Sequence, residues 1–159
     1  MLPKLSPIQR CPSCGKYFFA KDAETRHTRE GFSEDTGELT YEQLKEAAAQ
    51  FGTDLSPDDR KTLNYHLLWA YNDKYNREGI ETAIAPDEEQ EYINAVLDEL
   101  IASEGIEDID RAEYYRECGL FIKTLELLQD CKPDDDFMSG LVERLRKYAK
   151  ECMTIAFEI

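Results

Sequence analysis

The sequence lacks the motifs by which many enzymes are recognised. It has no glycine-rich phosphate loop, no G-x-S-x-G nucleophile elbow and no H-E-x-x-H metalloprotease motif. It also has no apolar run long enough to cross a bilayer, and Pro3 and Pro7 stand at an N-terminus without the apolar stretch of a secretory signal. We therefore expect a cytoplasmic protein that is not an enzyme and does not bind membranes.

Basic residues are scarce relative to acidic ones: 19 Lys and Arg stand against 34 Asp and Glu, a formal net charge of -15. The imbalance is uneven. The first 30 residues carry six basic and three acidic residues, whereas the remainder carries 13 and 31. So acidic a chain repels nucleic-acid phosphates, and we expect no nucleic-acid partner. The acid excess predicts either a well-solvated surface or a basic protein or peptide partner.

The chain has only five cysteines, and an odd number does not predict a disulfide framework. Cys131 and Cys152 fall on apolar faces of predicted helices, where free cysteine behaves as a small core residue. This usage favours a reducing compartment, as expected for the cytoplasm.

The other notable cysteines stand in the stretch CPSCGK, residues 11–16. This stretch resembles the knuckle of zinc ribbons, which has the form C-P-x-C-G-K, and the resemblance implies a structural zinc ion on Cys11 and Cys14. Zinc takes four ligands in a tetrahedron, yet no second C-x-x-C follows. His27 is the nearest candidate for a further ligand, and a second chain in a dimer would supply two more cysteines. A reversible disulfide and a metal-free relic are the other two states open to the pair.

A redox function is the alternative for the same two cysteines. C-P-x-C also occurs in glutaredoxin-like proteins, where the first cysteine caps a helix that lowers its pKa. Here Gly15 follows at once and residues 16–19 read as a strand, so a helix starting at Cys11 is not expected. A small redox or metal-handling protein therefore stays the second hypothesis.

The chain divides into three predicted parts. Residues 1–21 form a zinc-knuckle-like β hairpin, residues 22–39 a linker or long loop, and residues 40–159 a helical body. Caps, N-terminal prolines, stop glycines and the 3.6-residue period predict about six helices in antiparallel pairs. They are expected at 40–51, 56–77, 86–104, 108–118, 120–130 and 136–156. The predicted fold class is mainly α.

The segment AEYYRECGLFIKTLELLQD, residues 112–130, resembles one helix-turn-helix unit of the tetratricopeptide repeat. Ala112, Tyr115, Gly119 and Phe121 carry the resemblance. Thr124 departs from it, because the family usually has alanine there. The resemblance implies a solenoid-like body with a concave protein-binding surface; an ordinary helical hairpin is the alternative. Together with the knuckle, it resembles a small uncharacterised bacterial family, from which no activity follows.

One aromatic cluster on the second predicted helix is a candidate binding surface. Tyr65, Trp69, Asn72 and Asn76 share a helix face by their spacing. They predict either helix-helix core with amides bonded to loop backbone, or a peptide-binding groove. We therefore expect a non-enzymatic protein-protein interaction module with a structural or vestigial zinc knuckle.

Overall fold

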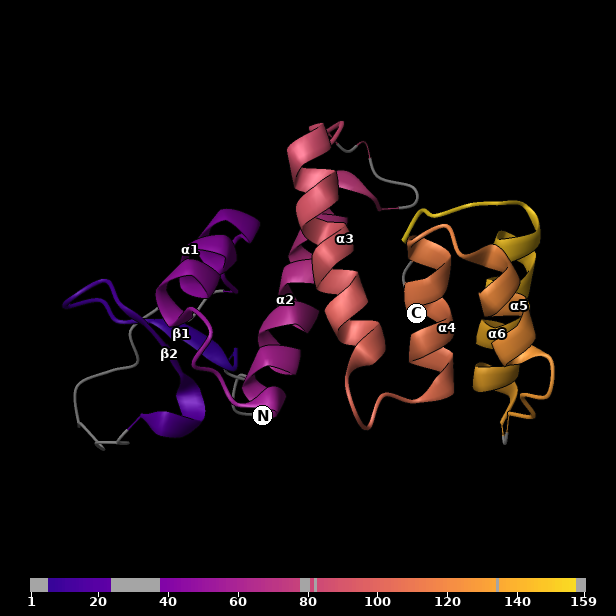
Figure 1. Ribbon diagram of the computed structural model, residues 1–159, viewed down its shortest axis with the longest axis horizontal. Helices are drawn as coiled ribbons and strands as arrows, with labels where there is room; N and C mark the ends of the chain where they lie inside the picture. Colours follow the sequence, from indigo (N-terminus) through magenta and orange to yellow (C-terminus); the bar gives the residue numbers. More distant parts are fainter. Residues whose placement is uncertain (1–5, 24–37, 78–80, 82, 134, 157–159) are drawn as a thin grey trace. The chain divides into compact units, whose positions relative to one another are not determined.

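A computed structural model describes residues 6–23, 38–77, 81, 83–133 and 135–156 (Figure 1). In these ranges the protein is mainly α, as predicted, with six helices packed as consecutive pairs and one two-stranded antiparallel hairpin. The strands are β1 (Ile8–Arg10) and β2 (Tyr17–Phe19), followed by a 3₁₀ turn at Ala20–Asp22. The helices are α1 (Tyr41–Phe51), α2 (Pro57–Tyr75), α3 (Asp87–Ala102), α4 (Asp108–Glu117), α5 (Phe121–Leu128) and α6 (Asp136–Lys150).

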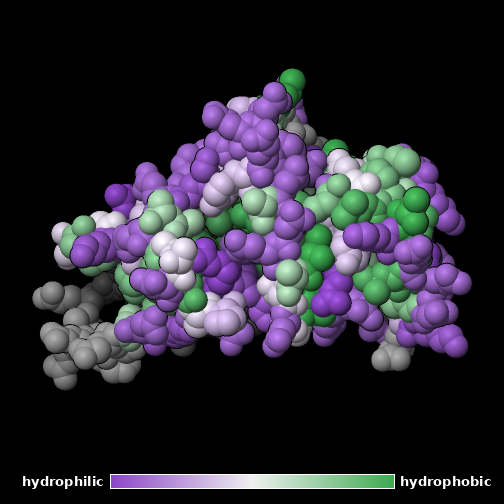
Figure 2. All heavy atoms as spheres, in the orientation of Figure 1, coloured by the Kyte–Doolittle hydropathy of each residue, from purple (hydrophilic) through white to green (hydrophobic). Residues whose placement is uncertain are grey.

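The chain forms two compact units, residues 1–70 and 71–159, and the division falls inside α2. The predicted linker at 22–39 lies mostly outside the described residues, so its boundaries stay a prediction. Of the described helices, none combines the length and the apolar character needed to cross a membrane. Hydrophilic side chains cover most of the face shown in Figure 2, with smaller hydrophobic patches among them.

Side-chain caps place the helix starts where the sequence predicts them. The hydroxyl of Thr40 accepts from the Gln43 N–H at 3.3 Å, and the Gln43 side chain accepts from the Thr40 N–H at 2.9 Å. This capping box satisfies two donors that the first turn of α1 cannot pair. The Ser56 hydroxyl does the same for the Asp59 N–H at the start of α2, at 3.2 Å.

In the first unit the hairpin packs on α1. Ile8, Tyr17 and Phe19 are buried, and the Phe19 ring stacks on Phe51 with centroids 5.1 Å apart. The side-chain amide of Gln50 bonds both backbone groups of Tyr17, each at 2.9 Å. These are edge-strand groups that the hairpin cannot pair by itself. These contacts with α1 hold the hairpin, and with it the knuckle, in place.

In the second unit, α4 and α5 form a tight helical hairpin. Gly119 has φ 73°, the left-handed conformation that ends α4 and turns the chain. Ala112 and Thr124 are fully buried, and the Thr124 hydroxyl donates to the Ala112 carbonyl at 3.1 Å. Helix α6 closes the core, which is built from Ala112, Leu128, Val142 and Leu145.

Two details of the last predicted helix are wrong. It ends at Lys150 rather than near residue 156, because Cys152 turns out of the helix with φ 55°. Cys152 is consequently exposed, not a core residue, whereas Cys131 does pack against the core. Phe137, which shares the apolar stripe of this helix, lies in its first turn and is 62% exposed.

Candidate functional site

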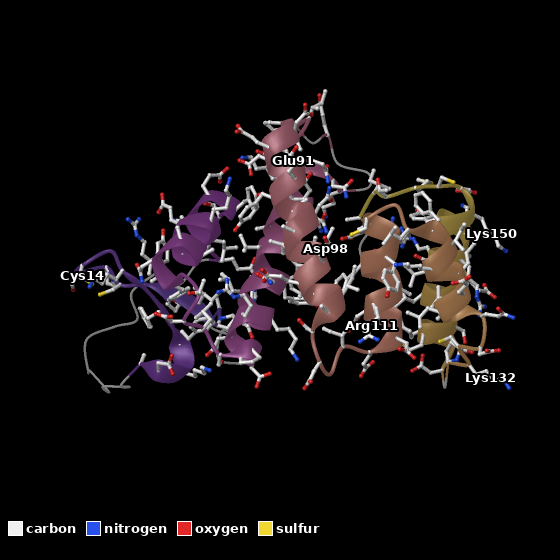
Figure 3. The ribbon with its side chains drawn as sticks, in the orientation of Figure 1. Cys14, Glu91, Asp98, Arg111, Lys132 and Lys150 are labelled. Atoms are coloured by element: carbon white, nitrogen blue, oxygen red, sulfur yellow. The ribbon has the colours of Figure 1, made fainter. Side chains whose placement is uncertain are left out.

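The knuckle is a closed turn between the two strands. The Cys11 N–H donates to the Lys16 carbonyl and the Gly15 N–H donates to the Cys11 carbonyl, both at 2.8 Å. Gly15 has φ 73°, so this position favours glycine. Both cysteines are free thiols; Cys11 is partly buried and Cys14 is exposed. Figure 3 labels Cys14 at the turn of the hairpin.

The backbone of the turn stabilises a thiolate at Cys11. Hydrogen bonds from the backbone N–H of Cys14 first, and of Ser13 next, hold the pKa of the Cys11 thiol below its usual value. A contact with the Cys14 side chain acts in the same direction. Because thiolate is the form that binds metals and acts as a nucleophile, the turn suits either chemistry.

Two basic side chains flank the knuckle. The Arg10 Nε donates to the Gly15 carbonyl at 3.2 Å, and its guanidinium lies 5.7 Å from the centre of the Tyr17 ring. Lys16 follows the turn directly. These groups cannot bind a cation, but their charge favours an anionic cluster of thiolates.

The described residues hold two candidate zinc ligands in the knuckle, Cys11 and Cys14. Across the described ranges, no group of three His, Cys, Asp or Glu side chains is placed to hold a metal ion. Cys11 and Cys14 carry thiol side chains, and thiolate sulfur is a ligand that zinc prefers. His27, the predicted further ligand, lies outside the described residues.

The aromatic residues of α2 form a cluster in the first unit. The Tyr65 and Trp69 rings lie 4.4 Å apart between centroids, and His66 lies 6.1 Å from each of them, edge-on. Trp69 is nevertheless 52% exposed. Burial lowers the pKa of His66, against the opposing charge of Glu38. The imidazole is therefore held toward its neutral form, which suits ring packing.

The two amides predicted beside these rings belong to the second unit, where both make internal hydrogen bonds. Asn72 is buried and donates to the Glu117 Oε1 at 3.3 Å. Asn76 donates to the Thr154 carbonyl at 3.2 Å, and its own carbonyl accepts from the Ala156 N–H at 2.8 Å. Their predicted role in partner binding stays a prediction.

A buried charged cluster on α4 was not predicted from the sequence. On α4 the Arg116 side chain is fully buried and the Glu117 side chain is only 5% exposed, and Arg116 pairs with the partly buried Glu113. Burial first, and the charge of Glu113 next, raise the pKa of Glu117 to about 8. Burial, with the charges of Asp98 and Glu117, also raises the pKa of the neighbouring Cys118 to about 11. Charges three and four residues apart are common on exposed helix faces, so the sequence carried no signal for this burial.

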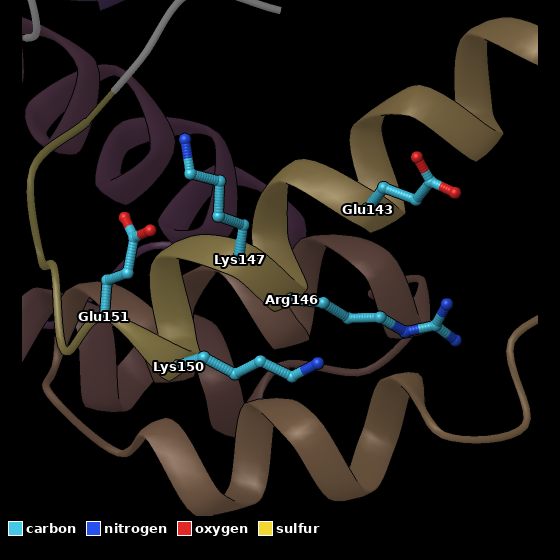
Figure 4. A pocket seen from close by; sticks show the side chains of 5 residues that line it. All are labelled: Glu143, Arg146, Lys147, Lys150 and Glu151. Carbon is cyan, nitrogen blue, oxygen red and sulfur yellow. The ribbon is translucent and has the colours of Figure 1, made fainter.

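A shallow hollow of about 330 Å³ lies along the end of α6 (Figure 4). Its lining is entirely charged: Glu143, Arg146, Lys147, Lys150 and Glu151. All five residues come from α6 and its C-cap, and Arg146 also donates to the Leu128 carbonyl. Cations in a last helical turn complement the helix dipole, which accounts for them without a ligand.

Comparisons with family models, with curated proteins and with solved structures found no match for this chain.

Proposed function

We propose that this chain is a non-enzymatic protein-interaction module that binds a basic peptide at the aromatic cluster of Tyr65, His66 and Trp69. A structural zinc ion on Cys11 and Cys14 would stabilise its N-terminal hairpin. The observation that carries the binding function is the exposure of Trp69, which is 52% exposed although its ring lies tilted against that of Tyr65, with centroids 4.4 Å apart. Tryptophan and tyrosine are the side chains that most often dominate binding energy at protein interfaces.

Charge favours a basic partner. The chain carries 34 acidic and 19 basic residues, so lysine- or arginine-rich segments are attracted at long range. At short range the faces of Trp69 and Tyr65 can hold an ammonium or guanidinium group by cation–π attraction. Glu38 acts electrostatically on His66 and adds negative charge beside the cluster.

The second unit supports a scaffold role. Its α4–α5 hairpin has the small residue, turn glycine and close approach that underlie the resemblance to a tetratricopeptide repeat. Thr124 fits in place of the family's alanine because its hydroxyl is bonded to the Ala112 carbonyl. Such hairpins serve as rigid supports for protein binding.

Zinc binding is supported by the knuckle itself. The turn presents two cysteines three positions apart, and backbone N–H groups stabilise the thiolate of Cys11. A site closed by four protein ligands has no open position for water, so its role would be structural.

The test of partner binding uses the single tryptophan of the chain, whose emission reports on Trp69 alone. We expect a peptide of alternating arginine and leucine to shift this emission to shorter wavelength, saturably and less strongly at high salt. A glutamate-leucine peptide of equal length should not. By calorimetry, Trp69→Ala should weaken binding at least about tenfold.

Phe137→Ala is the matched control, because Phe137 is also an exposed aromatic residue but lies on α6. It should leave the affinity unchanged. If Trp69→Ala and Tyr65→Ala fold normally and bind the arginine-leucine peptide as tightly as the unaltered chain, the proposed surface is wrong.

The second candidate function is a redox or metal-handling protein. Alkylation of Cys11 and Cys14 distinguishes it from an interaction module with structural zinc. If both thiols are protected from alkylation and a chelator abolishes this protection, the result supports structural zinc. Fast alkylation without chelator, together with a disulfide that forms and reduces reversibly, supports redox chemistry.

A further inference from the structure

We infer that the Cys11–Cys14 knuckle is half of a zinc site that a second copy of this chain completes, with four thiolates around one ion. The inference rests on the zinc binding proposed above and adds the source of the missing ligands. It makes assembly of two copies a consequence of metal binding.

The knuckle is held against α1 by contacts that bring no third ligand to it from the described residues. Gln50 bonds both backbone groups of Tyr17, and Phe19 stacks on Phe51. The Lys21 ammonium also lies 2.5 Å from the Asp59 carboxylate at the start of α2. These contacts hold the strands in place, and within the described ranges no third ligand stands near the two sulfurs. The missing ligands must therefore come from elsewhere.

The first unit contains few potential zinc ligands of the types used in closed structural sites. Residues 1–70 hold two cysteines and two histidines. His66 is half-buried against Tyr65 and Trp69 on α2, and it joins no group of ligands among the described residues. With His27 added, the unit reaches two cysteines, one histidine and at best a carboxylate.

That set is not one of the common closed structural sites, which are Cys₄, Cys₃His and Cys₂His₂. A second knuckle completes Cys₄ without any further residue. Two cysteines of the second unit are poorer candidates, because Cys131 packs against its core and burial keeps the Cys118 thiol protonated at neutral pH. The third, Cys152, is exposed, and its substitution is part of the test below.

The charge near the knuckle also favours a site with four thiolates. Four thiolates around one zinc ion form an anionic centre, which needs nearby positive charge. Each copy brings Arg10, whose side chain is bonded to the Gly15 carbonyl of the turn, and Lys16. The first 30 residues are net basic in a chain whose net charge is -15. Two copies therefore repel each other least where the knuckles meet.

The experiment measures zinc and mass in solution on full-length protein purified without a metal-affinity step. We expect a dimer with one zinc per two chains, and monomers after chelation. Cys14→Ser should abolish both the zinc and the dimer. Cys152→Ser should change neither, because Cys152 is exposed but lies in the second unit. His27→Ala should also leave both unchanged.

Cobalt(II) in place of zinc gives a readout on the unaltered chain. This measurement needs no substitution, so its result does not depend on whether a variant folds. Its absorption distinguishes four sulfur ligands from two sulfur and two nitrogen or oxygen ligands. A monomer with one zinc per chain would contradict the shared site, and so would loss of zinc in His27→Ala. Either result would still support zinc binding by the chain. A chain that binds no zinc overturns both the shared site and zinc binding.

Discussion

Arg116 and Glu113 form a bidentate ion pair on α4, with nitrogen–oxygen distances of 2.7 and 2.6 Å. The remaining guanidinium nitrogen donates to the Met153 carbonyl at 2.7 Å. Each of the three guanidinium nitrogens thus donates a hydrogen bond, whereas the Glu117 Oε1 lies 3.8 Å from Nη2, beyond hydrogen-bond distance. The Glu117 Oε2 is buried and has no hydrogen-bond partner among the described residues. A carboxyl in this position is favoured in its protonated form.

The first prediction is that Glu117 makes the stability of the second unit fall as pH rises. Burial raises its pKa to about 8 from a usual value of 4.5, so between these values the folded state binds more protons than the unfolded state. Stability is highest below pH 4.5 as far as this group is concerned, and it is lost progressively up to about pH 8. The loss is at most about 5 kcal/mol.

Urea unfolding of the unaltered chain and of Glu117→Gln, from pH 5 to 9, checks this prediction. The difference between the two isolates Glu117 from other groups, such as Asp110, whose pKa burial also raises. We expect the unaltered chain to lose stability relative to Glu117→Gln as pH rises. Glu126→Gln, which alters an exposed glutamate on α5, should run parallel to the unaltered chain. Parallel curves for Glu117→Gln as well would show that Glu117 is ionised throughout.

The second prediction concerns the hydroxyl of Thr124. It donates to the Ala112 carbonyl at 3.1 Å where both residues are fully buried. Thr124→Val keeps the shape but removes the donor, and we expect a loss of about 1–2 kcal/mol. Thr62→Val is the matched control, because its hydroxyl donates to the Asp58 carbonyl at an exposed site. Equal losses in the two variants, measured by urea unfolding, would contradict a special role for the buried bond.

The third prediction is that Gln50 fixes the hairpin to α1. Gln50→Ala leaves the N–H and the carbonyl of Tyr17 without their side-chain partner, and we expect a loss of about 1–3 kcal/mol. Hydrogen exchange at the Tyr17 amide should accelerate more than exchange in α4. Gln129→Ala, at an exposed position, is the control. Unchanged protection of Tyr17 would mean that the ring stacking of Phe19 and Phe51 suffices.

Helix starts were predictable because their signals are local. The capping box of Thr40 and Gln43, and the cap of α2 at Ser56, act within four residues and need no tertiary information. The end of α4 was equally readable, because Gly119 marks its left-handed turn. The turn of the knuckle was also predictable, since the hydrogen bonds that close it lie within residues 11–16.

Burial of charge was not predictable, because it depends on what the rest of the chain covers. Glu113, Arg116 and Glu117 have the spacing of an exposed helix face, and only tertiary packing buries the side chains of Arg116 and Glu117. The same holds for Asn72, whose amide lies against Glu117, 45 residues further along the chain. A candidate surface drawn from helical spacing alone therefore mixed exposed Trp69 with buried Asn72.

The last prediction concerns the end of α6, which the sequence did not predict correctly. The Cys152 N–H donates to the Ala149 carbonyl at 3.3 Å and the Met153 N–H donates to the Tyr148 carbonyl at 2.9 Å. The end of α4 has the same pair of bonds around Gly119. At the equivalent position of α6 stands Cys152, with φ 55°. A residue with a Cβ is disfavoured there by about 1–2 kcal/mol.

Cys152→Gly should therefore stabilise the chain by about 0.5–1 kcal/mol, after the entropy that glycine loses on folding. Cys152→Ala is the matched control: it removes the thiol but keeps the Cβ, so it should give no gain. Urea unfolding of the three proteins at one pH decides the matter. If alanine stabilises as much as glycine, the gain comes from losing the thiol, and the left-handed backbone at the end of α6 carries no strain.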